Sequence, residues 1–203
     1  MTAERKQHWE NVYESKGPDE VSWTQEVPSI SLAFIHALGI AKDAQIIDIG
    51  GGDSKLVDFL LDEGFENITV LDISAKALEK AKERLGEKAA RVSWIVSDVT
   101  EFKPTHSYDL WHDRAAFHFL TTPEQKAKYV DIVSEYVLGS LVIGTFSENG
   151  PLKCSGLEIA QYSAETLSEQ FNANFELVMS KVEDHTTPFE TTQNFVFGGF
   201  KRR

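Results

Sequence analysis

Short apolar runs alternate with amphipathic stretches through the middle of the chain. The apolar runs predict strands over residues 46–49, 68–71, 92–96, 108–111 and 141–146. Apolar positions spaced three and four apart predict intervening helices over residues 55–63, 74–85 and 123–137. This alternation implies parallel strands joined by right-handed crossovers. Strands made almost wholly of Ile, Val and Leu suit a sheet that is covered on both faces.

The two ends of the chain follow other patterns. Two helices are predicted over residues 4–15 and 28–38, before the first strand, and a further helix over 163–171. Residues 175–182 and 195–201 then predict two strands joined by a loop without a helix, which requires antiparallel pairing.

We therefore expect an α/β fold with a doubly wound, mostly parallel seven-stranded sheet. Helices are expected on both faces, with a C-terminal antiparallel β-hairpin closing the sheet. Residues 1–40 are expected to form an N-terminal helical cap and residues 41–203 the main domain, together one structural unit.

Charge narrows the choice of partners. The chain has 20 Lys and Arg against 32 Asp and Glu, a formal net charge of −12. Nucleic acids and anionic membrane surfaces attract basic proteins, so neither is an expected partner. The first residues are polar, no apolar run is long enough to span a bilayer, and the single cysteine, Cys154, forms no internal disulfide. These features favour a cytoplasmic protein.

Glycine and aspartate residues follow the first three predicted strands. Gly50, Gly51 and Gly52 allow the backbone to turn sharply and approach a ligand closely. Asp72 comes about twenty residues later, at the spacing of a carboxylate that binds ribose hydroxyls. Asp98 ends the third strand and suits an adenine amino group. Because the carboxyl ends of parallel strands share one edge of a sheet, these residues predict an adenosine site.

The charged residues around the glycine turn favour one adenosine compound over the others. Asp48 and Asp53 flank the turn, and Lys55 replaces the third glycine of the dinucleotide fingerprint. Two carboxylates would repel a pyrophosphate and attract the sulfonium and amino groups of S-adenosylmethionine. This disfavours the alternative of an NAD(P)-dependent oxidoreductase. A non-catalytic module that binds S-adenosylmethionine is a second alternative.

With these motifs the sequence resembles the class I S-adenosylmethionine-dependent methyltransferases, from about residue 46 to residue 146. Ser54 is a departure, since many members carry a further glycine there. Trp9, Tyr13 and Trp23 look like the N-terminal cap of small methyltransferases, including some protein-lysine methyltransferases, in which cap aromatics cover the cofactor. Packing of an amphipathic helix is the alternative explanation for each of these aromatic residues.

The resemblance implies S-adenosyl-L-methionine as cofactor. In the family, Gly50 and Gly52 would contact the methionine portion and Asp72 the ribose. Asp98 and the Val99 amide would bind adenine. The full set of implied cofactor-binding residues is Tyr13, Trp23, Asp48, Gly50, Gly51, Gly52, Asp72, Ile73, Asp98, Val99 and His112.

Three further segments are expected to bring polar groups to the same edge. They carry the candidate bases His112, Asp113, His118 and His185, together with Arg114 and Cys154. Methyl transfer needs a base only when the acceptor must lose a proton. Asp113 and Arg114 form a structural ion pair in the alternative interpretation. No close-spaced ligand pair indicates a metal site.

The sequence thus predicts an S-adenosylmethionine-dependent methyltransferase. The expected acceptor is a small molecule or a protein side chain such as lysine, and a net-negative protein suits a cationic or neutral acceptor better than a phosphorylated one.

Overall fold

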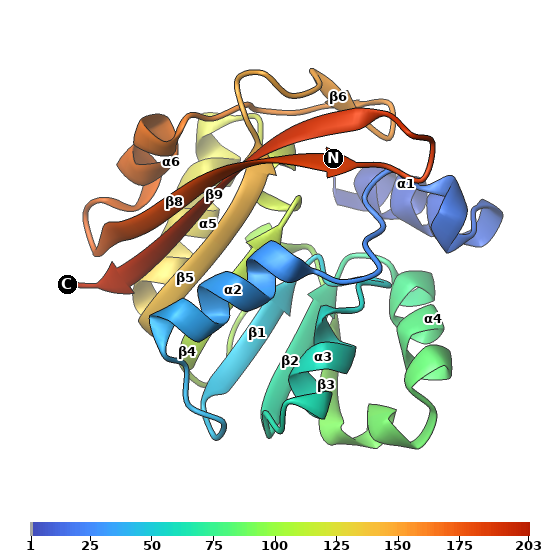
Figure 1. Cartoon of the computed structure of the whole chain (residues 1–203), viewed down its shortest axis with the longest axis horizontal. Coiled ribbons are helices and arrows are strands. Elements are labelled where there is room, and N and C mark those ends of the chain that lie inside the picture. The colour runs from blue at the N-terminus through green and yellow to red at the C-terminus, as the bar shows by residue number, and fades with distance from the viewer. Residues whose placement is uncertain (1) are drawn as a thin grey trace.

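Seven strands form one sheet in the order β3-β2-β1-β4-β5-β9-β8 (Figure 1). A computed structural model describes residues 2–203 of the chain. The strands are β1 (Gln45–Ile49), β2 (Asn67–Asp72), β3 (Val92–Val96), β4 (Tyr108–Arg114), β5 (Val137–Phe146), β8 (Phe175–Thr186) and β9 (Thr192–Arg202). Strands β1 to β5 pair in parallel, whereas β9 runs antiparallel to β5 and β8 antiparallel to β9. The expected sheet and its closing hairpin are confirmed.

Helices cover both faces of the sheet. One face carries α2 (Ser29–Leu38), α3 (Leu56–Asp62) and α4 (Ala75–Leu85), and the other carries α5 (Pro123–Tyr136) and α6 (Ala164–Phe171) (Figure 1). Each face has its own apolar core; Phe34, Ile46 and Leu60 belong to the first, and Trp111, Tyr129 and Phe171 to the second. The apolar strands β1 and β2 therefore have both of their faces buried, whereas β3, at the edge of the sheet, is only partly buried.

Short elements join these layers. They are the 3-10 turns η1 (Pro18–Glu20), η2 (Gly86–Arg91), η3 (Val99–Glu101) and η4 (Phe117–Phe119), and the small hairpin of β6 (Lys153–Cys154) with β7 (Leu157–Glu158). Capping residues set the helix ends. The Ser74 hydroxyl accepts the Ala77 amide at the start of α4, and Thr122 forms a capping box with Gln125 at the start of α5.

The strand order reverses between β1 and β4, and both strands point the same way. In parallel sheets such a switch point opens a crevice at the carboxyl ends of the strands. In the register, Asp48 lies beside His112, and Ile49 lies between Leu71 and Asp113. The ends of β1, β2, β3 and β4 thus meet along one edge.

Helix α1 (Thr2–Ser15) lies across this edge and contacts α4 (Figure 1). The Glu10 carboxylate accepts hydrogen bonds from the Ser74 hydroxyl (2.8 Å) and from the amides of Ala75 (3.0 Å) and Lys76 (3.1 Å). A carboxylate at a helix N-terminus pairs with free amides and with the helix dipole. Glu10 therefore docks α1 onto the start of α4. Helix α2 also belongs to the N-terminal cap that the sequence predicts. It packs into the sheet core through Phe34 and Ile35.

Strand β5 begins at Val137 and not at residue 141, and three further strands extend into polar residues beyond their predicted ends. Strand β4 continues through His112, Asp113 and Arg114, and the hairpin strands β8 and β9 take in residues 183–186 and 192–194 of the expected loop. The polar residues hid these extensions, because strand propensity and apolar pattern both stop before them. Pairing with β1, β5 and β9 continues the strands. Within residues 2–203, no helix combines the length and apolar character needed to cross a lipid bilayer.

Candidate functional site

The ends of β1 to β4 line an open cavity of about 750 Å³, which we call the edge cavity. A second cavity of about 1340 Å³, the turn cavity, lies along the glycine turn and the N-terminal segment. Tyr13, Trp23, Gly50 and Arg114 line both.

The structure brings most of the predicted cofactor-binding residues to these cavities. Those that line the edge cavity are Tyr13, Trp23, Gly50, Asp72, Ile73, Asp98 and Val99, and those that line the turn cavity alone are Asp48, Gly51 and His112. Gly52 lines neither.

The glycine turn is closely packed. Gly50 has φ +62° and Gly52 has φ +44°, a left-handed backbone that favours glycine. A Cβ on Gly50 would lie 2.8 Å from the Ala116 side chain, and one on Gly52 would lie 2.8 Å from the Tyr13 hydroxyl. The turn therefore tolerates no side chain at either position without movement of its neighbours.

Asp98 presents an unused oxygen to the edge cavity. Its Oδ1 accepts hydrogen bonds from the amide (2.9 Å) and the hydroxyl (2.8 Å) of Thr100, so that Asp98 is the N-cap of η3. Its Oδ2 is buried and has no hydrogen-bond partner among the described residues; the nearest cationic group is Arg5 Nη1, 3.9 Å away. A buried carboxylate oxygen without a donor is costly, so this atom fits a ligand that carries an N–H group, such as adenine.

Asp72 is a buried carboxyl at the end of β2. Its Oδ1 accepts the Ser74 amide at 2.8 Å. Burial, together with the charges of Asp48 and Glu10, raises the pKa of Asp72 to about 7 despite that bond. A ligand that donates hydroxyl groups would stabilise the charged form. The residues at the ends of β1, β2 and β3 thus fit an adenosyl compound.

Four aromatic side chains surround the mouth of the edge cavity. The ring centroid of Trp9 lies 5.2 Å from that of Phe119, 5.6 Å from that of Trp23 and 6.3 Å from that of Tyr13. All four rings line the cavity. Aromatic faces attract cations, so this cluster suits a ligand with a positively charged group.

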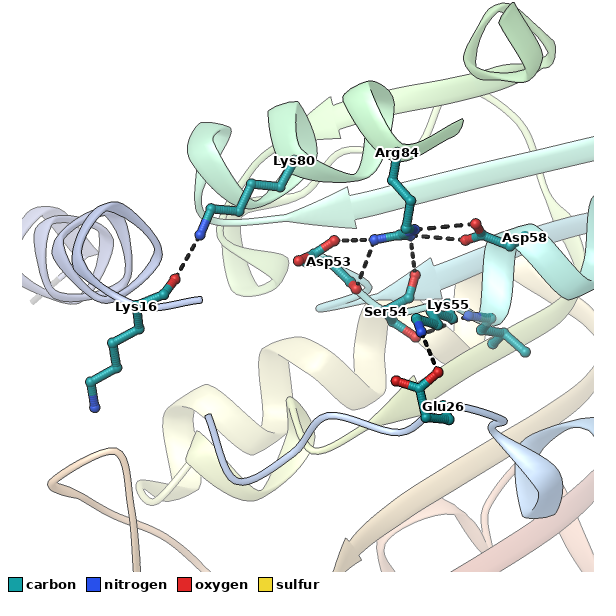
Figure 2. A network of polar contacts seen from close by, with 9 residues as sticks. Lys16, Glu26, Asp53, Ser54, Lys55, Asp58, Lys80 and Arg84 are labelled. Atoms are coloured by element: carbon teal, nitrogen blue, oxygen red, sulfur yellow. Dashed lines mark hydrogen bonds and ion pairs between the residues drawn. The ribbon is translucent and has the colours of Figure 1, made fainter. Parts of the chain in front are cut away.

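Ion pairs neutralise the acidic residues around the turn, which differs from what the sequence led us to expect (Figure 2). Arg84 pairs with Asp53, bonds the Ser54 carbonyl oxygen (2.8 Å) and pairs with Asp58 (2.8 Å). Lys55 pairs with Glu26 at 2.6 Å. The Asp53 carboxylate is therefore no free charge facing a ligand. It holds the turn to α4 instead.

The same network ties the N-terminal segment to the turn. Lys80 donates to the Lys16 carbonyl oxygen at 2.7 Å, and Glu26 belongs to the segment that follows η1 (Figure 2). The segment thus contacts α4 at one end and the start of α3 at the other.

The candidate bases occupy structural positions. His112 is buried, with Nδ1 2.6 Å from Asp48 Oδ1 and Nε2 2.8 Å from Ser31 Oγ. The other three, Asp113, His118 and His185, lie outside the residues that line either cavity. The sequence predicts that all four candidate bases reach one pocket, but only His112 lines a cavity, the turn cavity.

Asp113 holds the turn after β4. It is fully buried, and its carboxylate accepts hydrogen bonds from the amides of Ala116 (2.9 Å) and Phe117 (3.0 Å) and from the Tyr129 hydroxyl (2.7 Å). Burial raises the pKa of Asp113 to about 6 against these hydrogen bonds. No ion pair joins Asp113 to Arg114 in the described part of the chain, because neighbouring residues of a strand point to opposite faces.

The two remaining histidines are also held in place. Burial and the Arg114 charge lower the pKa of His118 to about 3, so its ring is neutral. The Nε2 atom of His185 lies 2.8 Å from the Ser22 carbonyl oxygen, which joins β8 to the N-terminal segment. Burial lowers the pKa of His185 as well.

Arg114 and Cys154 do reach the edge cavity. Arg114 Nη1 donates to the Trp23 carbonyl oxygen at 2.9 Å, and its Cζ lies 4.8 Å from the centre of the Phe195 ring. Burial raises the pKa of the Cys154 thiol to about 12, so it is not a thiolate nucleophile at neutral pH.

Sequence reasoning missed two contacts at the site. Ser31 holds His112 from α2, and Arg5 lies near Asp98 from α1. Both partners are distant in the sequence, and no local pattern marked either residue.

Comparison with known proteins follows this geometry. Residues 46–134 match the family described as "Methyltransferase domain". A malonyl-[acyl-carrier protein] O-methyltransferase of Anoxybacillus flavithermus is 35% identical over 105 residues, which are 51% of this chain and 39% of that protein. An EEF1A lysine methyltransferase 2 of Danio rerio is 25% identical over 208 aligned residues, which cover 96% of this chain and 81% of the relative.

A solved structure shares the fold over its whole length. The N-methyltransferase NodS from Bradyrhizobium japonicum, in complex with S-adenosyl-L-homocysteine, has a TM-score of 0.72 at 16% identity. The match covers 99% of this chain and 98% of NodS. At this identity the likeness concerns the fold.

The sheet order, the closing hairpin and the glycine and aspartate strand ends define a Rossmann-like methyltransferase fold. Residues 46–134 match a methyltransferase domain, and the fold of the chain is that of the class I S-adenosylmethionine-dependent methyltransferases. S-adenosylmethionine is the cofactor of this family, as the sequence motifs predicted.

Proposed function

We propose that this chain transfers the methyl group of S-adenosylmethionine to a small-molecule or protein side-chain acceptor. The observation that carries the proposal is the edge cavity, in which Gly50, Asp72 and Asp98 end three adjacent strands under an aromatic cap. The unpartnered Asp98 Oδ2 supports adenine binding, and the Asp72 carboxyl supports ribose binding.

The remaining residues take matching roles in this proposal. Gly50 and Gly51 leave room for the methionine portion, Gly52 gives the turn its shape, and Ile73 with the Val99 amide borders adenine. Tyr13 and Trp23, which line the edge cavity, would cover the cofactor, and aromatic rings suit its positively charged sulfur. When bound, S-adenosylmethionine supplies an electrophilic methyl group that an acceptor lone pair takes, while the sulfur keeps the electrons of the broken bond.

Positioning and exclusion of water supply the catalysis in this proposal. His112 has both ring nitrogens hydrogen-bonded, and Asp113, His118 and His185 do not line either cavity. Each of these four, the candidate bases of the sequence, has a structural contact instead. This arrangement supports an acceptor atom that reaches the site without a proton to lose, for which orientation is the main requirement.

The names of the relatives point to two acceptor classes. One is a malonyl-[acyl-carrier protein] O-methyltransferase and the other an EEF1A lysine methyltransferase. Since the chain covers less than half of the first relative, we carry neither acceptor over as such. A cytoplasmic location is part of the proposal, and the single buried, free cysteine supports it.

Isothermal titration with S-adenosylhomocysteine and with NAD tests the cofactor assignment. We expect the first to bind and the second not to. Asp98→Asn should weaken S-adenosylhomocysteine binding about tenfold, because asparagine has a single oxygen, which the Thr100 donors occupy, and its NH2 group cannot accept a hydrogen bond from adenine. Glu101→Gln, which removes an exposed carboxylate three residues away, is the matched control and should bind as the wild type does. NAD binding without S-adenosylhomocysteine binding would overturn the proposal.

Turnover is then measured as S-adenosylhomocysteine formed with panels of amines, alcohols, thiols and carboxylic acids. Binding without turnover on any panel would favour the non-catalytic module that binds the same cofactor.

A further inference from the structure

The Arg114 guanidinium has one edge without a protein partner. Nη1 donates to the Trp23 carbonyl oxygen, whereas Nε and Nη2 are buried and have no hydrogen-bond partner within residues 2–203. The N–H groups of Nε and Nη2 lie on the same edge of the guanidinium plane. Their spacing matches the two oxygen atoms of a carboxylate, which arginine binds in bidentate fashion.

Contacts elsewhere on the guanidinium hold it in place and leave this edge without a partner in the described residues. The Phe195 ring lies against one face of the guanidinium, 4.8 Å from Cζ, and Trp23 fixes the far nitrogen. Glu183 is near enough for its charge to act on Arg114, but no ion pair joins the two in the described residues. Burial lowers the pKa of Arg114 to about 10, so the side chain stays cationic at neutral pH.

Arg114 stands where an acceptor would lie. It lines both cavities, next to the turn that follows β4, and Cys154 and Phe119 border the same cavity from other segments. An unpaired buried cation with two free donors is costly to the folded protein. A ligand that supplies a pair of oxygen acceptors removes this cost.

We infer that Arg114 binds a carboxylate group of the methyl acceptor, so that the acceptor is a small carboxylic acid and not a lysine side chain. The inference rests on the proposed methyl transfer. A lysine ammonium group would be repelled by the guanidinium in a cavity where water screens charge weakly. A carboxylate oxygen takes the methyl group as its bond to sulfur breaks, which gives a methyl ester and S-adenosylhomocysteine. The acid is already ionised at neutral pH, so no base is needed, in agreement with the hydrogen-bonded state of both His112 nitrogens.

The cofactor itself also carries a carboxylate, on its methionine portion. Either the acceptor or the cofactor could supply the carboxylate that binds the Nε–Nη2 edge of Arg114, and the experiment distinguishes these two sources. Its first arm compares S-adenosylhomocysteine with 5′-methylthioadenosine, which has the same adenosine and thioether but no amino acid.

In this arm, isothermal titration is performed on the wild type and on Arg114→Met. We expect both compounds to bind the variant within about threefold of their wild-type affinity, because the cofactor does not depend on Arg114. A loss of about tenfold or more for S-adenosylhomocysteine, without a loss for 5′-methylthioadenosine, would assign Arg114 to the cofactor and overturn the inference.

The second arm measures acceptor binding to the complex with S-adenosylhomocysteine. The probes are benzoate, phenylacetate and succinate, each compared with its amide. The signal is the change in total tryptophan fluorescence, to which the cavity residues Trp9 and Trp23 contribute, and we expect at least one acid to bind more tightly than its amide. Arg114→Met should weaken that acid about a hundredfold and Arg114→Lys about tenfold, because lysine keeps the charge but loses the fork.

Two further variants sharpen this arm. Lys153→Met removes an exposed cation beside Cys154 and should leave acid binding unchanged. Glu183→Gln removes the nearby negative charge and should tighten acid binding. Thermal unfolding shows whether each variant is folded, and Arg114→Lys carries the test if Arg114→Met is not.

Acids that bind no better than amides, or no binding by any acid, would overturn the inference. Equal methylation of a lysine peptide by the wild type and Arg114→Met would do so as well. Failure of S-adenosylhomocysteine to bind the wild type would instead remove the proposed function, so the two failures are distinguishable.

Discussion

His112 Nδ1 lies 2.6 Å from Asp48 Oδ1, and both side chains are buried beneath the glycine turn. The pair joins β4 to β1 at positions that are neighbours in the sheet register. Asp48 Oδ2 in turn lies 2.6 Å from the place where a Cβ on Gly51 would be. The pair is therefore packed directly against the turn and supports its shape.

His112→Phe removes both hydrogen bonds of this histidine at similar volume and leaves a buried carboxylate unpaired. We expect the free energy of unfolding to fall by about 3 kcal/mol. Urea denaturation followed by circular dichroism measures this loss. Ser31→Ala removes only the second contact and should cost about 1 kcal/mol. A variant His112→Phe as stable as the wild type would show that the pair does not support the turn.

Asp113→Asn tests whether Asp113 is a base or a structural residue. An NH2 group would replace one carboxylate oxygen and could not accept a hydrogen bond. Either the bond from Tyr129 or the two bonds from the turn amides would be lost, so we expect a loss of about 1–3 kcal/mol in stability. The shape of the pH profile of kcat should remain that of the wild type, measured on any acceptor that turns over. A profile that loses one limb in the variant would restore Asp113 as the base.

The raised pKa of Asp113 also sets a pH dependence of stability. Its folded pKa of about 6 lies above the unfolded value, so the folded state holds the proton more tightly. This contribution is complete below about pH 4 and is lost as the pH rises through about 6. The stability difference between the wild type and Asp113→Asn should therefore shrink over this range in urea titrations.

Asp72 predicts a pH dependence of adenosine binding. In the proposed complex, ribose hydroxyls donate to the charged form of the Asp72 carboxyl, whose pKa is about 7 in the free protein. The dissociation constant of 5′-methylthioadenosine should therefore rise as the pH falls below 7, approaching about tenfold per pH unit. This probe lacks the amino group of the cofactor, which titrates separately. Asp72→Asn should bind weakly at every pH. A pH-independent affinity in the wild type would contradict the role of Asp72.

Glu10→Gln tests the docking of α1. Although burial raises it, hydrogen bonds from Ser74, Lys76 and Ala75 hold the pKa of Glu10 below its ordinary value. The stability that this docking contributes is therefore present above the ordinary pKa of a glutamate. It is lost as the pH falls through the lowered pKa of Glu10. Glu10→Gln should expose α1 to limited proteolysis and cost about 1 kcal/mol. Glu14→Gln, on the same helix, breaks only an exposed pair with Lys76 and should change little.

Local patterns explain why the fold was predictable. Apolar runs such as Ile46–Ile49 and Ile68–Leu71 are buried on both faces, so their composition alone marks parallel strands. The glycine turn and the strand-end aspartates follow the same rule, because residues at the carboxyl ends of parallel strands must share one edge. Predictions that depend only on neighbours along the chain were confirmed for the fold, for the methyltransferase domain of residues 46–134 and for the cofactor.

The candidate bases show where local patterns stop. His112 and Asp113 are adjacent in the sequence, but their side chains point to opposite faces of the sheet because side chains alternate along a strand. Asp113 contacts Tyr129 of α5, and His112 contacts Ser31 of α2. Their strand membership depends on pairing with β1 and β5, and the residues that pair are far away in the sequence. The sequence therefore named polar candidates but not the side of the sheet to which each points.

The sequence by itself determined the parallel sheet, its closing hairpin and the edge that holds the ligand, since strand and helix periodicity and the glycine turn are local properties. The tertiary structure decided which charges remain free there. Arg84 neutralises Asp53 and His112 engages Asp48, while the Nε–Nη2 edge of Arg114 has no partner among the described residues. These outcomes depend on contacts between segments 30 to 90 residues apart, and charge pairing at such separations follows from packing and not from composition.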